Sequence, residues 1–140
     1  MLYTTIGRYS VSLSSSPDVI NRHTREFAVV TKRLTTHESR GDYVAIGIAD
    51  ARLGEDPLVE GQYYPGPASG FHPGILIIPE TDIVFIGVGT NVIVYSMAPI
   101  SEIVHIQTEA GFWCWKRHGT SVLMCAELEI AVWSINGQKR

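Results

Sequence analysis

The stretch GFWCWKRHG, residues 111–119, gathers three aromatic rings, a cysteine, two cations and a histidine. Alternate side chains of an extended strand share a face, so Trp113, Trp115 and Arg117 are expected on one side. Two indole rings and a guanidinium on one face can stack against an aromatic ring or a base. The alternative is that both indoles fill a core and that Arg117 emerges at the strand end. The other, half-exposed side of the strand is expected to carry Phe112, Cys114, Lys116 and His118.

The loop YYPGPASGFHPG, residues 63–74, is a second place where ligand-binding side chains gather. Aromatic residues stand there among glycines and prolines, and loops held on a rigid scaffold often carry binding residues. If the protein binds a small aromatic ligand, we expect Tyr63, Tyr64 and His72 to cover that ligand on the strand at 112–118. The alternative is a structural crossover that packs these aromatic rings on the edge of a sheet.

Residues that could perform acid–base or nucleophilic catalysis are scattered along the chain. Cys114 and Cys125 fall in segments with the pattern of strands, where small buried thiols are common. The best acid–base set that the sequence offers is His72, His118 and Glu127, drawn from a loop and from strand ends. We therefore expect no catalytic residue, with a small enzyme that uses this set as the alternative.

Metal and cofactor motifs do not occur. None of the five histidines belongs to an HxH, HxxxH or HExxH motif, and the two cysteines form no CxxC motif. Because such spacings bring metal ligands together, no metal site is expected. The single GVG at 87–89 lacks the third glycine and the following helix of a dinucleotide-binding loop. The sequence therefore predicts no metal and no organic cofactor.

Length and composition bound the class of protein. The 140 residues, 45% of them apolar, fit one globular domain over 1–140. Only 18% are charged, which leaves apolar surface for a protein partner or a second copy. The basic residues are scattered and the formal net charge is −3, so nucleic-acid binding is not expected. No apolar run is long enough to span a membrane. Two cysteines without a disulfide framework indicate reduced thiols in the cytoplasm.

Short runs of Val, Ile and aromatic residues, separated by Gly, Pro, Asn and Asp, predict a mainly β protein. Residues 2–6 and 9–13 are expected to form a hairpin, and 26–36 and 42–50 are expected to pair as the next two strands. We expect an antiparallel two-sheet sandwich or a flattened barrel.

Three further segments complete the predicted organisation. One short helix is expected at 17–25, with Ser16 as its N-cap. Residues 51–74 are rich in Gly and Pro and predict a long loop. Residues 75–135 are expected to form a continuous β meander, with several strands apolar on both faces and therefore placed between two layers.

An internal repeat is visible in the second half of the chain. TDIVFIGVGTNVIVYSM (81–97) aligns with TSVLMCAELEIAVWSI (120–135), with one gap, at an offset of about 39 residues, close to the period of a propeller blade. Residues 72–140 resemble WD-type and quinoprotein-type β-propeller blades, with VWSINGQKR in the place of the terminal W-D. Two blades cannot close a propeller, so the resemblance implies blade-like hairpins within the sandwich or barrel. The alternative is that any two neighbouring hairpins align as well. The aligned pairs include Ile83 with Val122, Phe85 with Met124, Tyr95 with Trp133 and Ser96 with Ser134.

The segment that runs from HPGILIIPE to VWSINGQKR is also similar to a group of small uncharacterised bacterial proteins. Single domains of this size are common among products of mobile gene cassettes, and this resemblance implies a bacterial origin. Asn136-Gly137 is a type I′ turn signal followed by three polar residues. Either the returning strand is very short or the natural protein continues.

These patterns together predict a non-catalytic binding or protein-interaction module that can self-associate. The alternative is a small enzyme or ligand-binding protein whose site lies between the 63–72 loop and the 112–118 strand.

Overall fold

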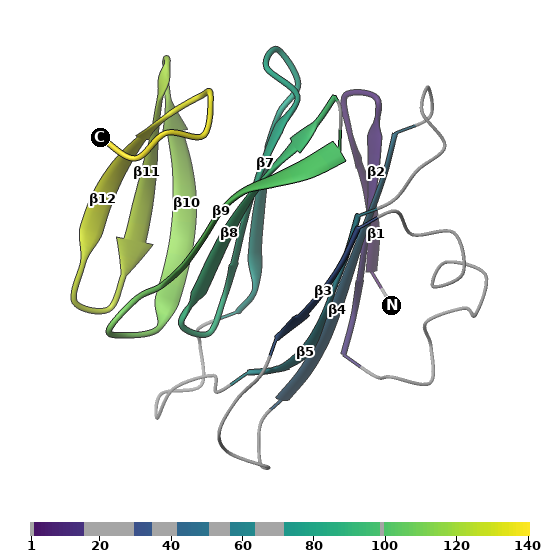
Figure 1. The fold of residues 1–140 in the computed structure, drawn as a ribbon, viewed down its shortest axis with the longest axis horizontal. Helices are drawn as coiled ribbons and strands as arrows, with labels where there is room; N and C mark the ends of the chain where they lie inside the picture. The colour runs from purple at the N-terminus through teal and green to yellow at the C-terminus, as the bar shows by residue number, and fades with distance from the viewer. Residues whose placement is uncertain (1, 16–29, 35–41, 51–56, 64–71, 99) are drawn as a thin grey trace. The chain divides into compact units, whose positions relative to one another are not determined.

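A computed structural model describes residues 2–15, 30–34, 42–50, 57–63, 72–98 and 100–140 (Figure 1). Every regular element among them is a β-strand, which confirms the mainly β prediction. The helix expected at 17–25 falls outside the described residues. The chain divides into two compact units, Met1–Tyr63 and Tyr64–Arg140, and the single domain expected from its length stays a prediction.

The first unit is a five-stranded sheet with the order β1-β2-β4-β5-β3. Its strands are β1 (Leu2–Ile6), β2 (Tyr9–Ser14), β3 (Val30–Leu34), β4 (Asp42–Asp50) and β5 (Pro57–Tyr63). The expected first hairpin is confirmed, because β1 pairs antiparallel with β2 around Gly7, whose φ is 61°. A positive φ at this turn suits glycine, which has no Cβ to clash.

The predicted pairing of β3 with β4 is wrong. The strand β5 lies between them, pairing antiparallel with β4 and parallel with β3. Part of the expected 51–74 loop is therefore a strand. Its sequence, PLVEGQY, hides this because Pro57 and Gly61 are typical of loops, whereas Val59 is fully buried.

The second unit contains two antiparallel meanders joined between β9 and β10 (Figure 1). The four-stranded sheet consists of β6 (Gly74–Ile78), β7 (Ile83–Val88), β8 (Asn91–Met97) and β9 (Ile100–Gln107). The three-stranded sheet consists of β10 (Phe112–His118), β11 (Ser121–Ala126) and β12 (Ile130–Ser134). Tight turns with positive-φ glycines join β7 to β8 at Gly89 and β10 to β11 at Gly119.

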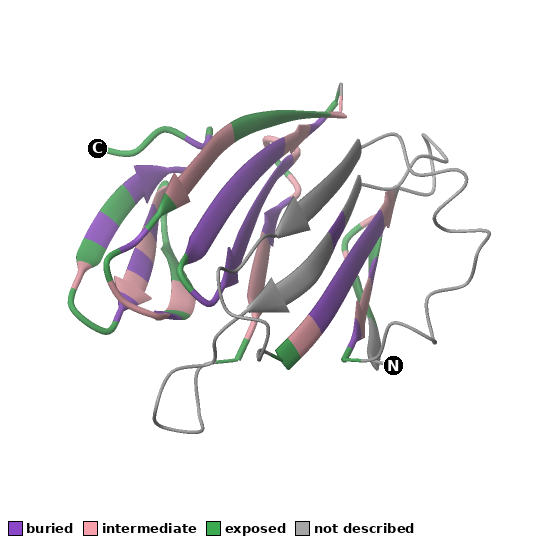
Figure 2. Cartoon of the chain, turned by 60° about the horizontal axis from the view of Figure 1, so that its bottom comes forward, coloured by how far each residue is buried: buried purple, intermediate pink, exposed green. Residues whose placement is uncertain are grey.

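The two sheets of the second unit share one hydrophobic core. Alternate positions of β11 and β12 are buried, and most positions between them are more exposed (Figure 2). The strands β7 and β8 are buried on both faces, as their apolar runs predict. This pair of sheets is the part of the sandwich prediction that the structure supports, whereas the barrel alternative is wrong for the described strands because all three sheets have two edge strands. The buried core residues are Ile78, Ile83, Phe85, Val92, Val94, Phe112, Val122, Met124, Ala126, Ala131 and Trp133.

The two hairpins of the proposed repeat differ in register. Ile83 lies opposite Ser96, whereas its aligned counterpart Val122 lies opposite Trp133. Trp133 belongs to the shared core and Tyr95, its aligned counterpart, does not. The alignment therefore matches the first strands of the two hairpins but reverses the faces of the second strands.

The chain turns back after β12 and returns along it for only a few residues. Gly137 has a φ of 83°, and Trp133 forms a bridge with Lys139. The backbone N–H of Ser134 donates to Gln138 O at 2.8 Å, and that of Arg140 donates to Val132 O at 2.8 Å. A turn at Asn136-Gly137 is thus confirmed, but its predicted type I′ is wrong, because that type needs a positive φ at both residues and Asn136 does not have one. No helix in the described part of the chain is long and apolar enough to cross a membrane.

Candidate functional site

A β-bulge in β10 separates the residues that were expected to form one platform. The pairing of β10 with β11 shifts between Phe112 and Cys114, so Trp113 is an extra residue without a partner in the ladder. Phe112 is 1% exposed, and its ring centroid lies 5.3 Å from that of Trp115. Phe112 and Trp115 are three residues apart, and they share a face only because the bulge adds one residue between them. Trp113, Trp115 and Arg117 therefore do not form one face, and the expected outward position of Phe112 is wrong.

The Phe112 ring rests on two glycines that lie opposite each other in the four-stranded sheet. Gly74 of β6 pairs with Gly87 of β7. A Cβ atom added to Gly87 would lie 2.4 Å from the Phe112 ring, and one added to Gly74 would lie 2.6 Å from it. Because neither position has room for a side chain, the glycine pair forms a seat that joins the start of β10 to the other sheet.

Trp115 belongs to an aromatic cluster in the core of the second unit. Its ring centroid lies 5.1 Å from that of Phe85 and 6.4 Å from that of Trp133. The tilted and edge-on arrangements are the favoured geometries for aromatic pairs. The Nε1 atoms of Trp115 and Trp133 are buried without a hydrogen-bond partner in the described structure. Trp115 thus contributes to packing, in agreement with the alternative prediction that the indole rings fill a core.

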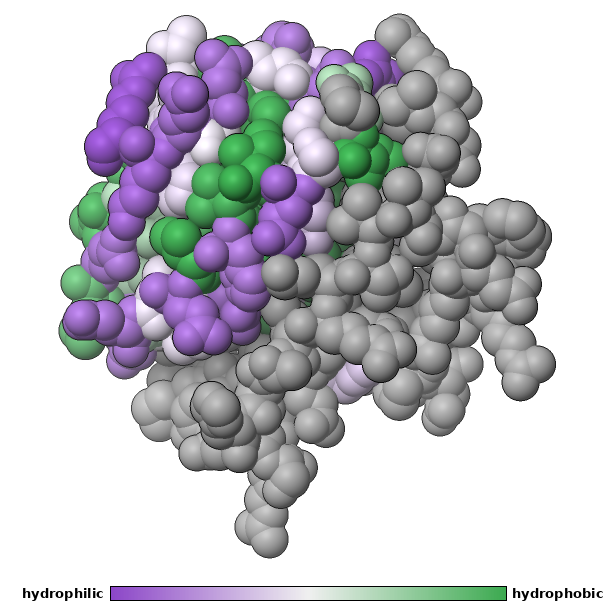
Figure 3. Space-filling view, in the orientation of Figure 1, coloured by the Kyte–Doolittle hydropathy of each residue, from purple (hydrophilic) through white to green (hydrophobic). Residues whose placement is uncertain are grey.

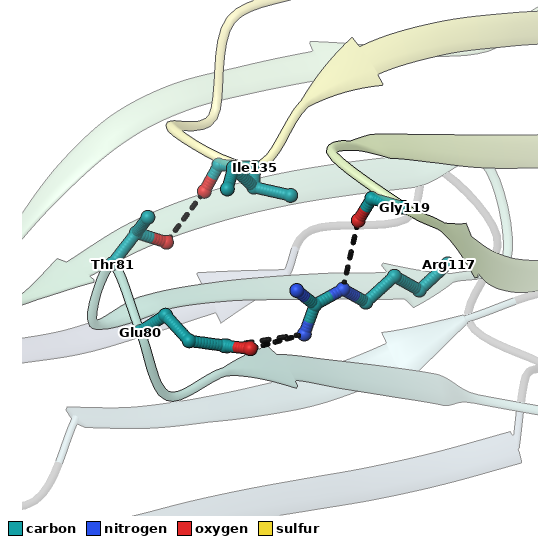
Figure 4. Close-up of polar contacts among 5 residues, drawn as sticks. All are labelled: Glu80, Thr81, Arg117, Gly119 and Ile135. Carbon is teal, nitrogen blue, oxygen red and sulfur yellow. Dashed lines mark hydrogen bonds and ion pairs between the residues drawn. The ribbon is translucent and has the colours of Figure 1, made fainter.

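Arg117 connects the two sheets at one end of the second unit (Figure 4). Its Nη1 donates to both carboxylate oxygens of Glu80, at 2.9 and 3.0 Å, and its Nε donates to Gly119 O at 3.1 Å. Beside this contact the Thr81 hydroxyl donates to Ile135 O at 2.6 Å. The pKa of Glu80 is lowered, first by its own backbone N–H and then by Arg117. The guanidinium therefore contacts both sheets of the second unit, and its role in ligand binding stays a prediction.

The remaining tryptophan is exposed. Trp113 is 61% exposed, and three further large apolar residues, Leu128, Ile130 and Val132, are also exposed in or next to β12. The register places Ile130 opposite Cys125, at the end of the sheet where the β11–β12 turn lies. We call Trp113, Leu128, Ile130 and Val132 the apolar patch.

The two cysteines face each other across two strands. Cys114 of β10 lies directly opposite Cys125 of β11, and both thiols are partly exposed. Burial raises the pKa of the Cys114 thiol, and its hydrogen bond with Cys125 raises it further, while Lys116 acts in the opposite direction. Sequence reasoning missed this pair, although the signal was present. A two-residue turn at Gly119-Thr120 sets the register that brings the two cysteines together.

The three loop residues of the expected ligand site lie in different parts of the chain. Tyr63 is the last residue of β5 and belongs to the first unit. Tyr64 lies outside the described residues. His72 is exposed and belongs to the second unit. The closure of this loop over β10 stays a prediction.

No contact in the described part of the chain brings the acid–base set of the enzyme alternative together. His72, His118 and Glu127 are all exposed, and no hydrogen bond or ion pair joins any two of their side chains. Within the described ranges, no three His, Cys, Asp or Glu side chains come together as metal ligands.

Comparison with known proteins adds no relative from which a role could be transferred. No protein-family model matches the chain, and no curated protein matches it significantly. Any function must therefore be argued from the chain's own residues.

Proposed function

We propose that this chain is a non-catalytic interaction module that self-associates through the apolar patch. One observation carries the proposal: of the five large apolar residues that are exposed in the described part of the chain, four belong to the patch. The fifth, Ile103, lies on β9. Exposed apolar residues that gather in one place mark contact sites more often than residues scattered singly.

The chemistry of the patch suits a second copy of the same chain. Its four side chains carry no charge, so two copies that face each other meet no repulsion there. Figure 3 shows hydrophobic atoms beside hydrophilic ones at the lower left edge of the view, where Figure 1 draws β12 and the β11–β12 turn. Four side chains make a small surface beside the roughly 800 Å² that each partner buries in a standard stable interface. We therefore expect a weak, reversible dimer.

The cellular setting that we propose is a reducing bacterial cytoplasm. Both cysteines are free in the structure, which suits a compartment that keeps thiols reduced. The binding of a small aromatic ligand is a weaker proposal, because the bulge in β10 separates the two indole rings that were expected to hold it.

Light scattering over a range of protein concentrations tests the self-association. We expect the wild-type mass to rise reversibly towards that of a dimer, and Ile130→Lys to remain monomeric because a buried unpaired ammonium opposes the contact. Ile103→Lys is the matched control, since it makes the same change outside the patch and should behave as the wild type. A wild type that is monomeric throughout, or a control that dissociates as fully as Ile130→Lys, would contradict the proposal.

A further inference from the structure

We propose that Cys114 and Cys125 form a redox-active pair that a peroxide oxidises to a reversible intramolecular disulfide. The inference rests on the register of β10 and β11 and does not depend on the apolar patch or on self-association. The two thiols make a modification site whose substrate class is small peroxides and whose reversal uses small thiol reductants.

The register places the two cysteines close to each other. They are directly opposed residues of an antiparallel pair. Such residues have Cα atoms about 4.5–5.5 Å apart, and disulfides span Cα separations of about 4.4–6.8 Å. The register also places both side chains on the side of the sheet away from the core. Closing the S–S bond therefore needs only a local adjustment of the two strands.

The backbone hydrogen bonds identify which kind of opposed pair this is. The N–H of Ala126 donates to Glu129 O, on the side of β12. Successive residues of a strand direct their backbone N–H and C=O groups to opposite sides. The backbone groups of Cys125 therefore point towards β10 and Cys114. The pair is thus of the hydrogen-bonded kind, in which the Cα atoms lie about 5.5 Å apart. The Cβ atoms of such a pair lie farther apart than the roughly 3.8 Å of a disulfide, so the closed bond is strained and easily reduced.

One peroxide molecule oxidises one pair of thiols to a disulfide. A thiolate sulfur attacks one peroxide oxygen, so an S–O bond forms, the O–O bond breaks and the leaving hydroxide is protonated to water. The resulting sulfenic acid has lost two electrons, which the peroxide gains. The second thiolate then attacks the sulfenic sulfur, the S–S bond forms, and the S–O bond breaks to release a second water. A reductant thiol reverses the reaction through a mixed disulfide.

The surroundings favour a thiol pair over a metal site. Both sulfurs are partly exposed on the side of the sheet away from the core, so small oxidants reach them. Their neighbours on that face include Lys116 on β10 and Ile130 on β12. No third His, Cys, Asp or Glu joins the pair within the described residues, so a closed metal site is not formed there.

The test is limited oxidation of the full chain with hydrogen peroxide, followed by mass spectrometry and peptide mapping without reductant. We expect both thiols to disappear together, the intact mass to fall by two hydrogen atoms, and the peptides that contain Cys114 and Cys125 to be cross-linked within one chain. Dithiothreitol should restore both thiols. Two unreacted thiols, adducts on one cysteine alone, or a disulfide between two chains would overturn the proposal.

A matched variant tests whether the disulfide requires cysteines that lie directly opposite each other or only two cysteines in the same hairpin. Combining Cys125→Ser with Leu123→Cys moves one thiol two residues along β11, where it lies opposite Lys116 instead of Cys114. This variant keeps two cysteines in the same hairpin and should give sulfenic acid, trapped by dimedone, without the cross-link. If it forms the intramolecular disulfide as fast as the wild type, the register is not the cause and the proposal fails.

Discussion

Arg117 and Glu80 join the two sheets of the second unit through one guanidinium nitrogen that lies 2.9 and 3.0 Å from the two carboxylate oxygens. The same guanidinium donates to Gly119 O in the β10–β11 turn. The contact lies on the surface, since the side chains of Arg117 and Glu80 are 35% and 58% exposed. It is therefore a modest contribution to stability that depends on pH and salt.

The first prediction concerns the pH dependence of this contact. Because the pKa of Glu80 is lower in the folded chain than in the unfolded one, its stabilisation is complete above the unfolded value of 4.5 and is lost as the pH falls through the folded value. Glu80→Gln should therefore lower the thermal midpoint at neutral pH and leave it unchanged in strong acid. Glu127→Gln, at an exposed carboxylate without an ion pair, is the control. An equal effect of Glu80→Gln at both pH values would contradict the assignment.

The second prediction concerns the glycine seat of Phe112. Gly87→Ala places a Cβ against the ring, and overpacking of this kind costs about 1–3 kcal/mol of unfolding free energy. Combining it with Phe112→Leu removes the ring that the Cβ meets. The cost of Gly87→Ala should then be smaller in the Phe112→Leu background than in the wild type, as measured by denaturant unfolding. Simple additivity of the two changes would rule out the contact as the cause.

The third prediction separates the tryptophans by their exposure. Trp113 is exposed, whereas Trp115 is partly buried in the aromatic cluster and Trp133 is fully buried. Iodide should quench mainly the fluorescence of Trp113. Trp113→Phe should therefore shift the emission to shorter wavelength and remove most of the quenching. Quenching that survives in this variant at the wild-type level would show that the bulge does not turn Trp113 outwards.

The fourth prediction compares two buried tyrosines. The Tyr95 hydroxyl is buried without a hydrogen-bond partner in the described structure, whereas Arg8 donates to the Tyr9 hydroxyl at 2.9 Å. Tyr95→Phe should leave the unfolding free energy unchanged or raise it, and Tyr9→Phe should lower it by about 1 kcal/mol. Equal losses from both changes would mean that the Tyr95 hydroxyl is bonded in solution.

Alkaline titration gives a second measurement on Tyr95. Burial, followed by the charge of Glu102, raises its pKa above the usual range for tyrosine. The stability that this raised pKa reflects is complete below the unfolded value of about 10 and is lost as the pH rises through the folded value. The wild type should therefore lose more stability than Tyr95→Phe above about pH 10.

The strands were predictable because their signals are local. The alternation in β1 and β2, and the Asn136-Gly137 turn, each lie within a few residues and match the structure. The strand β5 was missed because its hydrogen-bond partners, β3 and β4, precede it in the chain and its own sequence contains Pro57 and Gly61. A strand of this kind is specified by its neighbours more than by its own residues.

The candidate site also contains one feature that the sequence predicts and one that it does not. The opposition of Cys114 and Cys125 follows from the turn at Gly119-Thr120 by counting residues, so it could have been derived from the sequence. The bulge at Trp113 could not, because it lies beside a contact of the Phe112 ring with glycines of another sheet, and local sequence does not reveal that contact. No pattern within FWCWKRH marks one residue as the extra one.

The returning segment after β12 has a consequence for how copies of the chain can assemble. Backbone groups of Val132 and Ser134, on the free side of β12, are already bonded to Arg140 and Gln138. An open strand edge is a template on which further chains add and grow into fibrils. With these backbone groups occupied, another strand cannot add at this end of β12, so contacts between copies near β12 must be made by side chains.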